Sequence, residues 1–135
     1  MENTQKFIAG TKIVIVEDDK FLGGLVSKKL ADDGCVVRHL ETGEVAQSSV
    51  ESDVPDLIFL DLLLPGMSGF DVLDRLKKSN KTKDVPVIIL SNLGERDDIR
   101  RGLDLGATSF LIKASMTVDT IVGEASRILR IRRKQ

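Results

Sequence analysis

The sequence predicts an α/β domain in which five parallel strands form one sheet with helices on both faces. Short apolar runs alternate five times along the chain with segments of helical periodicity. Three of these runs, at residues 13–16, 57–60 and 87–90, are apolar without alternation, which is typical of parallel strands buried on both faces. Strands that alternate with helices require right-handed crossovers, and these crossovers place the helices in two layers.

The five predicted strands are short and rich in branched aliphatic side chains, a combination that favours strands over helices. They are expected at residues 12–16, 35–40, 56–60, 85–90 and 108–112.

The first helix is expected from Phe21 to Leu30, where the apolar side chains share one broad face. Gly34 lies beyond its end and is a typical stop signal. The glycine pair Gly23 and Gly24 weakens this helix, which indicates close packing at that point.

Four further segments also have the apolar spacing of helices, and the third of the four is highly charged. They are expected from Thr42 or Gly43 through Ser49, around Phe70, Leu73 and Leu76, over residues 95–105, and from an N-cap at Thr117.

The length of 135 residues fits one domain. We expect a loose, polar lead-in at residues 1–11, the domain at residues 12–131 and a basic tail at residues 132–135. Two interpretations of the basic C-terminal residues stay open. They are either a solvated helix end, where cations suit the helix dipole, or a docking tail or linker.

Composition excludes several classes of protein. The net charge of −1 argues against nucleic-acid binding by the domain as a whole. Cys35 is the only cysteine, so no internal disulfide can form, and its apolar neighbours predict a buried, inert thiol. No apolar run approaches the length of a membrane span, so a cytoplasmic protein without membrane contact is expected. His39, the only histidine, is expected at the surface near a strand end rather than as a ligand or phosphodonor.

Polar side chains follow four of the five predicted strands. They are Glu17, Asp18 and Asp19 after the first strand, Asp61 after the third, Ser91 and Asn92 after the fourth, and Lys113 after the fifth. In open α/β sheets, ligands bind at these carboxyl ends, where the strand order reverses. If the order is 2-1-3-4-5, a common order that is assumed here, the first and third strands are neighbours and their acids meet.

The acids of this edge predict a metal site. Glu17, Asp18 and Asp61 would repel one another unless a cation lies among them, and oxygen ligands suit Mg²⁺. Lys113 would add a fixed cation. This combination fits phosphoryl transfer to Asp61 as the nucleophile, with Ser91 donating a hydrogen bond to a phosphoryl oxygen.

Each element taken alone has an ordinary structural explanation. Asp18 and Asp19 could be a solvated residue and a helix cap, and Asp61 could be a turn residue before a Leu-Pro-Gly turn. A single lysine after a strand is usually solvated. The occurrence of all four elements at successive strand ends favours a phosphoacceptor site.

Four segments resemble the receiver domain of two-component response regulators. They are residues 13–19 (IVIVEDD), 57–70 (LIFLDLLLPGMSGF), 85–91 (VPVIILS) and 106–113 (GATSFLIK). The resemblance extends from about Lys12 to Leu129, and as a set these motifs are highly specific. It implies a flavodoxin-like (βα)5 fold with strand order 2-1-3-4-5. It also implies a phosphorelay signalling protein, which catalyses only its own phosphorylation and dephosphorylation and is not otherwise an enzyme.

The same resemblance implies residue roles at the metal site. Asp61 matches the phosphorylated aspartate. Asp18 and Asp61 match direct Mg²⁺ ligands, Glu17 matches a ligand acting through water, and the backbone carbonyl of Leu63 matches the third protein ligand.

Further positions match the residues that respond to phosphorylation. Ser91 matches the switch hydroxyl, Lys113 the phosphoryl-binding lysine, and Phe110 the aromatic whose rotamer reports phosphorylation, although Phe110 could also be an ordinary core residue. The implied partners are a histidine kinase or phosphotransfer protein, and a downstream effector that binds the fourth helix, fifth strand and fifth helix.

The chain departs from the family pattern near the expected site. Ala114 stands where proline usually follows the lysine, so the geometry of this loop cannot be carried over, and Asn92 replaces a usually small residue and could narrow access to Asp61. Leu63 and Leu93 flank the site and cannot orient a hydrolytic water by hydrogen bonding, so we expect a slowly decaying phosphorylated state.

Other functions are compatible with an α/β fold of this kind. A flavodoxin-like cofactor binder would need a phosphate-binding loop where this chain has acids, and the glycine patterns of nucleotide-binding proteins are missing from the sequence. The main alternative is a receiver-like protein-interaction module that is not phosphorylated, an interpretation favoured by Asn92 and Ala114.

Overall fold

The computed structural model describes residues 6–133, in which strands and helices alternate. The strands are β1 (Lys12–Val16), β2 (Val36–Leu40), β3 (Leu57–Leu60), β4 (Val87–Ser91) and β5 (Ser109–Ile112). The α-helices are α1 (Lys20–Asp32), α2 (Ala46–Ser52), α3 (Gly69–Lys78), α4 (Arg96–Asp104) and α5 (Val118–Arg133). Residues 1–5 of the expected lead-in and residues 134–135 of the expected tail lie outside the described residues.

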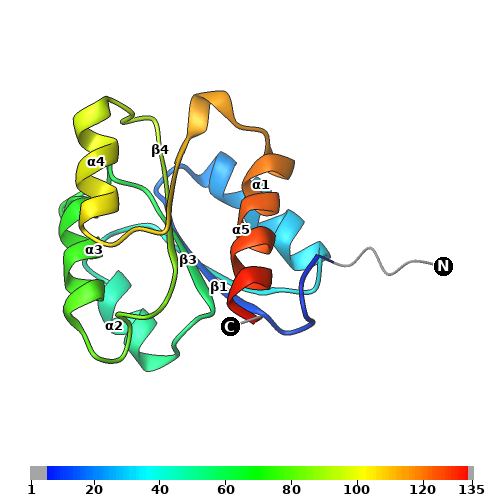
Figure 1. Ribbon diagram of the computed structural model, residues 1–135. Helices are drawn as coiled ribbons and strands as arrows, with labels where there is room; N and C mark the ends of the chain where they lie inside the picture. The colour runs from blue at the N-terminus through cyan, green and yellow to red at the C-terminus, as the bar shows by residue number, and fades with distance from the viewer. Residues whose placement is uncertain (1–5, 134–135) are drawn as a thin grey trace.

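The sheet has the expected topology. All its strand pairs are parallel and the order is β2-β1-β3-β4-β5. Figure 1 shows α1 and α5 on one face of the sheet and α2, α3 and α4 on the other. The prediction of a doubly wound, flavodoxin-like (βα)5 fold is confirmed.

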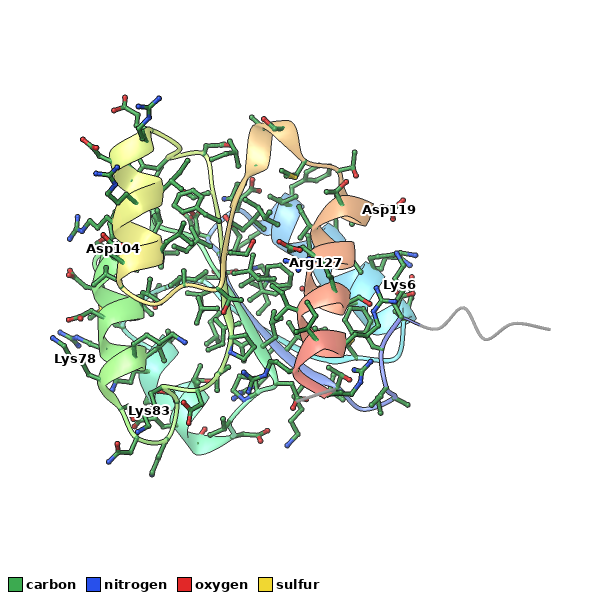
Figure 2. The ribbon with its side chains drawn as sticks, in the orientation of Figure 1. Lys6, Lys78, Lys83, Asp104, Asp119 and Arg127 are labelled. Atoms are coloured by element: carbon green, nitrogen blue, oxygen red, sulfur yellow. The ribbon has the colours of Figure 1, made fainter. Side chains whose placement is uncertain are left out.

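Two hydrophobic cores separate the sheet from its helical layers. Side chains alternate along β1, so Ile13 and Ile15 face α1 and α5, whereas Val14 and Val16 face α2 and α3. All four are at most 1% exposed. Charged side chains lie outside these layers, as Lys78 and Asp104 do in Figure 2. The central strands are therefore apolar on both faces, which explains why they lack alternation in the sequence.

Side-chain caps fix the beginnings of several helices. Asp19 Oδ1 accepts hydrogen bonds from the backbone N–H groups of Phe21 and Leu22 at the start of α1. Ser68 caps α3 in the same way, and the expected cap Thr117 accepts from Thr120 N at 3.1 Å. α1 ends before Gly34, which has the positive φ of 97° that makes glycine a stop signal.

The expected strand bounds are within two residues of the observed ones. β4 starts after Pro86, two residues later than predicted, because proline has no N–H to donate to a neighbouring strand.

The second helix was placed too early. It begins at Ala46 instead of Thr42 or Gly43, and Ala46 N closes a turn by donating to Gly43 O. Gly43 lies so close to α3 that an added Cβ would be 2.9 Å from Val72 Cγ2. The chain therefore passes α3 as a turn and becomes helical afterwards.

The prediction of a loose lead-in is wrong for its described part, residues 6–11. Phe7 is 3% exposed and belongs to the core beneath α1 and α5. Ser126 of α5 donates a hydrogen bond to Lys6 O, and Gly10 N donates to Gly34 O. At the other end, α5 continues through Arg133, so the first two residues of the predicted basic tail are helical.

Cys35 is buried as predicted, and burial raises the pKa of its thiol to about 11. Between residues 6 and 133, every helix is too short or too polar to cross a lipid bilayer.

Candidate functional site

Strand register brings Glu17 and Asp61 together. Val16 of β1 pairs with Leu60 of β3, so the residues that follow them leave the sheet side by side. Asp61 N donates to Val16 O at 2.9 Å. Both carboxylates are buried, with 2% of Glu17 and 3% of Asp61 exposed. Two acids are thus held in contact within a region where charge is poorly solvated.

Asp18 completes an acidic cluster at the same edge. Glu17, Asp18 and Asp61 each offer a carboxylate oxygen, and these oxygens lie within 4.8 Å of one another. Asp18 is exposed, whereas the other two are buried. Asp19 does not join them because its side chain caps α1. The ordinary explanation as a helix cap therefore holds for Asp19, whereas Asp18, although exposed, lies with Glu17 and Asp61.

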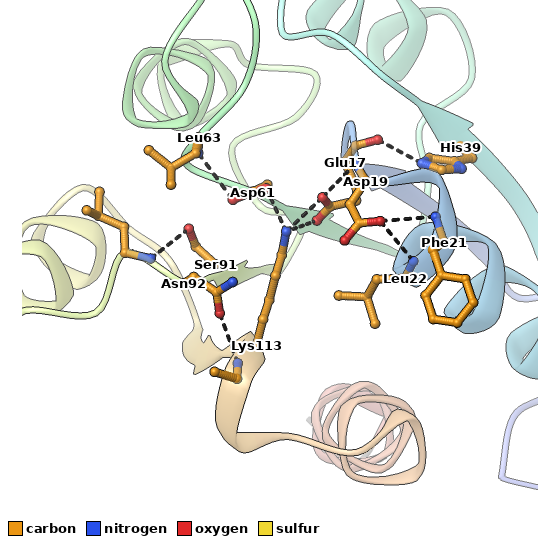
Figure 3. Close-up of polar contacts among 12 residues, drawn as sticks. Glu17, Asp19, Phe21, Leu22, His39, Asp61, Leu63, Ser91, Asn92 and Lys113 are labelled. Atoms are coloured by element: carbon orange, nitrogen blue, oxygen red, sulfur yellow. Dashed lines mark hydrogen bonds and ion pairs between the residues drawn. The ribbon is translucent and has the colours of Figure 1, made fainter.

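Lys113 reaches into the cluster from the end of β5 (Figure 3). Its Nζ lies 2.7 Å from Asp61 Oδ2 and 2.7 Å from Glu17 Oε1. Only 11% of its side chain is exposed. Burial alone would lower the pKa of Lys113, but the hydrogen bonds to Asp61 and Glu17 outweigh burial and raise it. The ammonium group thus offsets part of the negative charge.

Glu17 remains incompletely compensated. Burial raises the pKa of Glu17 from 4.5 to about 7, although hydrogen bonds from Lys113 and from Asp19 N lower it. Its Oε2 lies 2.6 Å from Lys113 Nζ but has no partner in hydrogen-bond geometry among residues 6–133. A buried carboxylate oxygen with an unused lone pair, next to two further carboxylates, fits a hard cation such as Mg²⁺.

The segment after Asp61 is packed against the site. Asp61 Oδ1 accepts a hydrogen bond from Leu63 N at 3.1 Å, and the Leu63 side chain is 56% exposed. Gly69, the first residue of α3, lies against this segment: an added Cβ would be 2.6 Å from Leu62 Cα and would overlap Asp61 O. The backbone of Asp61 is therefore fixed by close contact with α3.

Ser91 ends β4 at the same edge of the sheet. It is fully buried and pairs in register with Ile112, the residue before Lys113. Its Oγ accepts a hydrogen bond from Leu93 N at 3.3 Å. The hydroxyl keeps its own proton to donate to another acceptor.

Phe110 lies within β5, before its carboxyl end, and is half-buried in the core beneath α2, α3 and α4. Its ring lies against Gly102, where an added Cβ would be 3.2 Å from Phe110 Cδ2. Phe110 therefore contacts α4 rather than the acids.

Two contacts at the site were not predicted from the sequence. His39 was expected at the surface, but it is half-buried and its Nε2 lies 2.8 Å from the backbone oxygen of Glu17. Its ring fills the space above Gly23, where an added Cβ would be 2.6 Å from His39 Nε2. The expected close packing at the glycine pair is thus found at Gly23, and its signal in the sequence was the glycine itself. Gly24 faces open space.

The second unpredicted contact joins the two departures from the family pattern. The Lys113–Ala114 peptide is trans, and Ala114 N donates a hydrogen bond to Asn92 Oδ1 at 2.9 Å. The Asn92 side chain is therefore engaged with the loop after β5 (Figure 3).

Comparison with known proteins gives a consistent family. A sequence profile described as "Response regulator receiver domain" matches residues 13–123. A DNA-binding dual master transcriptional regulator, RpaA of Synechocystis sp., is 36% identical over 119 residues, which cover 88% of this chain and 49% of RpaA. This chain thus spans about half the length of the curated relatives it matches.

Solved structures agree in fold. A putative response regulator from Chloroflexus aurantiacus matches with a TM-score of 0.82 at 27% identity, covering 90% of this chain and 98% of that one. The BeF3-activated N-terminal receiver domain of RstA from Klebsiella pneumoniae matches with a TM-score of 0.80 at 27% identity, covering 88% and 98%.

Proposed function

Because this chain belongs to the response regulator receiver domain family, we propose that Asp61 accepts a phosphoryl group from a histidine kinase or a phosphotransfer protein. The observation that supports this most is the environment of Asp61. Its carboxylate is buried at the edge of the sheet, beside two other acids and 2.7 Å from Lys113 Nζ.

The proposed reaction is the attack of an Asp61 oxygen on phosphorus. An O–P bond forms as the P–N bond of a phosphohistidine breaks, and the leaving imidazole nitrogen keeps the bonding electron pair. The main barrier is electrostatic, because a carboxylate approaches a negatively charged phosphoryl group. Lys113 lowers this barrier by placing its ammonium group where the charge accumulates. Ser91 would donate its hydroxyl proton to a phosphoryl oxygen.

Glu17, Asp18 and Asp61 would hold Mg²⁺, with the backbone carbonyl of Leu63 as a further ligand. The all-oxygen donor set supports this choice of ion, as does Oε2 of Glu17, which has no hydrogen-bond partner among the described residues. When bound, Mg²⁺ would neutralise charge between the carboxylate and the phosphoryl group. His39 supports the site from outside, since it contacts the backbone oxygen of Glu17.

Output would follow from a change at β4, β5 and α4. Ser91 lies next to the start of the β4–α4 loop, and Phe110 contacts α4 at Gly102. A movement of Ser91 toward a phosphoryl group would change the space available to Phe110. A downstream effector would then recognise the face formed by α4, β5 and α5. With its single cysteine buried and reduced, the domain is expected to act in the cytoplasm.

The second candidate function is a protein-interaction module that is not phosphorylated. It is favoured by Asn92 and Ala114, which depart from the family pattern. Incubation with Mg²⁺ and acetyl phosphate, followed by intact mass measurement, separates the two functions. The proposed function predicts a gain of one phosphoryl group that requires Mg²⁺. No gain with Mg²⁺ present would favour the interaction module.

A further inference from the structure

Two loops that bear candidate reactive residues are tied together by side chains. The β4–α4 loop follows Ser91, and the loop after β5 begins with a short 3-10 helix, Lys113–Ser115. Ala114 N donates to Asn92 Oδ1 at 2.9 Å across these loops. A second contact supports the first, because Gly94 lies against Ile112 so closely that an added Cβ would overlap its Cδ1 atom.

This hydrogen bond between Asn92 and Ala114, here called the tie, holds the peptide group that follows Lys113. The N–H of this peptide belongs to Ala114 and is bonded to Asn92, whereas its C=O belongs to Lys113 and accepts from Met116 N at 3.2 Å. Both polar ends of one peptide are therefore held. Since a peptide group is planar, holding both ends fixes its orientation. The orientation of this peptide sets the direction in which the Lys113 side chain leaves the backbone, and in this orientation Nζ lies 2.7 Å from Asp61 Oδ2.

The chemistry of residue 114 makes the tie possible. Proline has no N–H, so a proline at position 114 could not donate to Asn92. An alanine adds an N–H donor, and it also frees φ from the restraint of the proline ring. Asn92 supplies the acceptor for this N–H. The orientation of the Asn92 amide follows, because only its oxygen can face a donor. The two departures from the family pattern are thus complementary.

We propose that Asn92 is a positioning residue that, through the N–H of Ala114, holds Lys113 in place for phosphoryl transfer to Asp61. This inference rests on the proposed function. Asn92 does not touch the reacting atoms in this role. It replaces, with a side-chain hydrogen bond, the backbone restraint that proline would give, and it makes the β4–α4 loop and the lysine loop move as one unit.

The first test measures the hydrogen bond between Ala114 N and Asn92 directly and does not depend on phosphoryl transfer. Asn92→Leu keeps the approximate shape of the side chain but removes the acceptor, whereas Asn92→Asp keeps an acceptor oxygen. Hydrogen exchange of the Ala114 amide is measured by NMR in both variants. We expect exchange roughly two- to tenfold faster in Asn92→Leu, the range for loss of one exposed hydrogen bond, and close to wild type in Asn92→Asp. Unchanged exchange in Asn92→Leu would overturn the proposal.

The second test measures the rate of phosphoryl uptake from acetyl phosphate with Mg²⁺. Asn92→Leu is expected to slow uptake roughly two- to tenfold. Asn80→Leu, an exposed asparagine change on the α3–β4 loop, is the matched control and is expected to keep the wild-type rate. Equal rates for Asn92→Leu and Asn80→Leu would contradict the positioning role.

A double-variant cycle with Ala114→Pro tests whether Asn92→Leu slows phosphoryl uptake only through the N–H of Ala114. Since Ala114→Pro already removes the donor, Asn92→Leu is expected to have no further effect on uptake in that background. Independent, multiplying effects would refute the tie. If wild type itself takes up no phosphoryl group, the proposed function fails, and the exchange measurement still decides whether Asn92 holds the lysine loop.

Discussion

The interior of the sheet and its carboxyl edge differ in what their buried residues do for the fold. In the interior, Ile13 and Val14 are apolar, fully buried and surrounded by other hydrocarbon side chains. At the edge, Glu17 and Asp61 are equally buried but carry ionisable carboxyl groups. Burial of an apolar side chain stabilises the fold, whereas burial of a charge costs stability unless it is compensated. The buried acids at the edge therefore lower the stability of the fold, while they supply the groups that the proposed phosphoryl transfer needs.

We therefore expect substitutions in the two regions to change the free energy of unfolding in opposite directions. Removing an interior side chain should destabilise the protein and leave phosphoryl uptake in place. Neutralising an acid at the edge should stabilise the protein without metal and impair the function.

The largest effect is expected for Phe7→Ala in the interior. Phe7 is almost fully buried between the sheet, α1 and α5, so its removal should lower the free energy of unfolding by about 3–5 kcal/mol. Urea unfolding monitored by circular dichroism measures the change. Ile8→Ala, at a neighbouring residue that is 58% exposed, is the control and should change stability little. A similarly small effect of Phe7→Ala would place the lead-in outside the folded domain.

A second effect is expected from the pH dependence of stability without divalent metal. The pKa of Glu17 is about 7 in the folded protein and near 4.5 when exposed, so between these values the folded state binds more protons. The contribution of Glu17 is therefore fully present below pH 4.5 and is lost as pH rises through 7, by about 3 kcal/mol.

Glu17→Gln removes this titration. The variant should be as stable as wild type at acidic pH and more stable above pH 7, as measured by urea unfolding in EDTA across that range. Parallel stability curves for the two proteins would show that burial of this charge has no cost.

A third effect is expected at the adjacent glycines of α1. Gly23→Ala should lower the free energy of unfolding by about 1–3 kcal/mol, because the new methyl group meets the His39 ring at the edge of the site. Gly24→Ala faces open space and should raise the free energy of unfolding by about 0.5–1 kcal/mol. Thermal unfolding of both variants gives the comparison, and effects of the same sign would contradict the close contact at Gly23.

The smallest effect is expected at the rim of the site. Leu93→Glu should speed loss of the phosphoryl group by about three- to tenfold, since a carboxylate can orient a hydrolytic water and leucine cannot. Decay is followed by intact mass after removal of acetyl phosphate. Leu103→Glu on α4 is the control and should decay like wild type. Equal or slower decay of Leu93→Glu would contradict the explanation that Leu93 makes the phosphorylated state decay slowly.

Local patterns in the sequence predicted the sheet and most of the site. Strand ends follow from apolar runs, and parallel strands bring their ends to one edge. Together with an assumed strand order of 2-1-3-4-5, the positions of Glu17, Asp61 and Lys113 in the chain therefore placed them together. Their mutual distances could not be predicted, because they depend on register and rotamers.

The contacts that were not predicted join segments without a periodic signal. Phe7 lies in an irregular segment, so periodicity could not indicate its burial. His39 and Asn92 each bind a backbone atom distant in sequence, at Glu17 and Ala114 respectively. Each residue alone resembles an ordinary surface residue, and only the folded chain shows its partner.

The most direct test of the account compares wild type with Asp61→Asn during incubation with acetyl phosphate and Mg²⁺. Asparagine has nearly the same shape as aspartate but lacks the nucleophilic carboxylate. We predict that wild type gains the mass of one phosphoryl group and that Asp61→Asn gains none, although it remains folded by circular dichroism. Equal uptake by the two proteins would contradict the assignment of Asp61 as the phosphoacceptor.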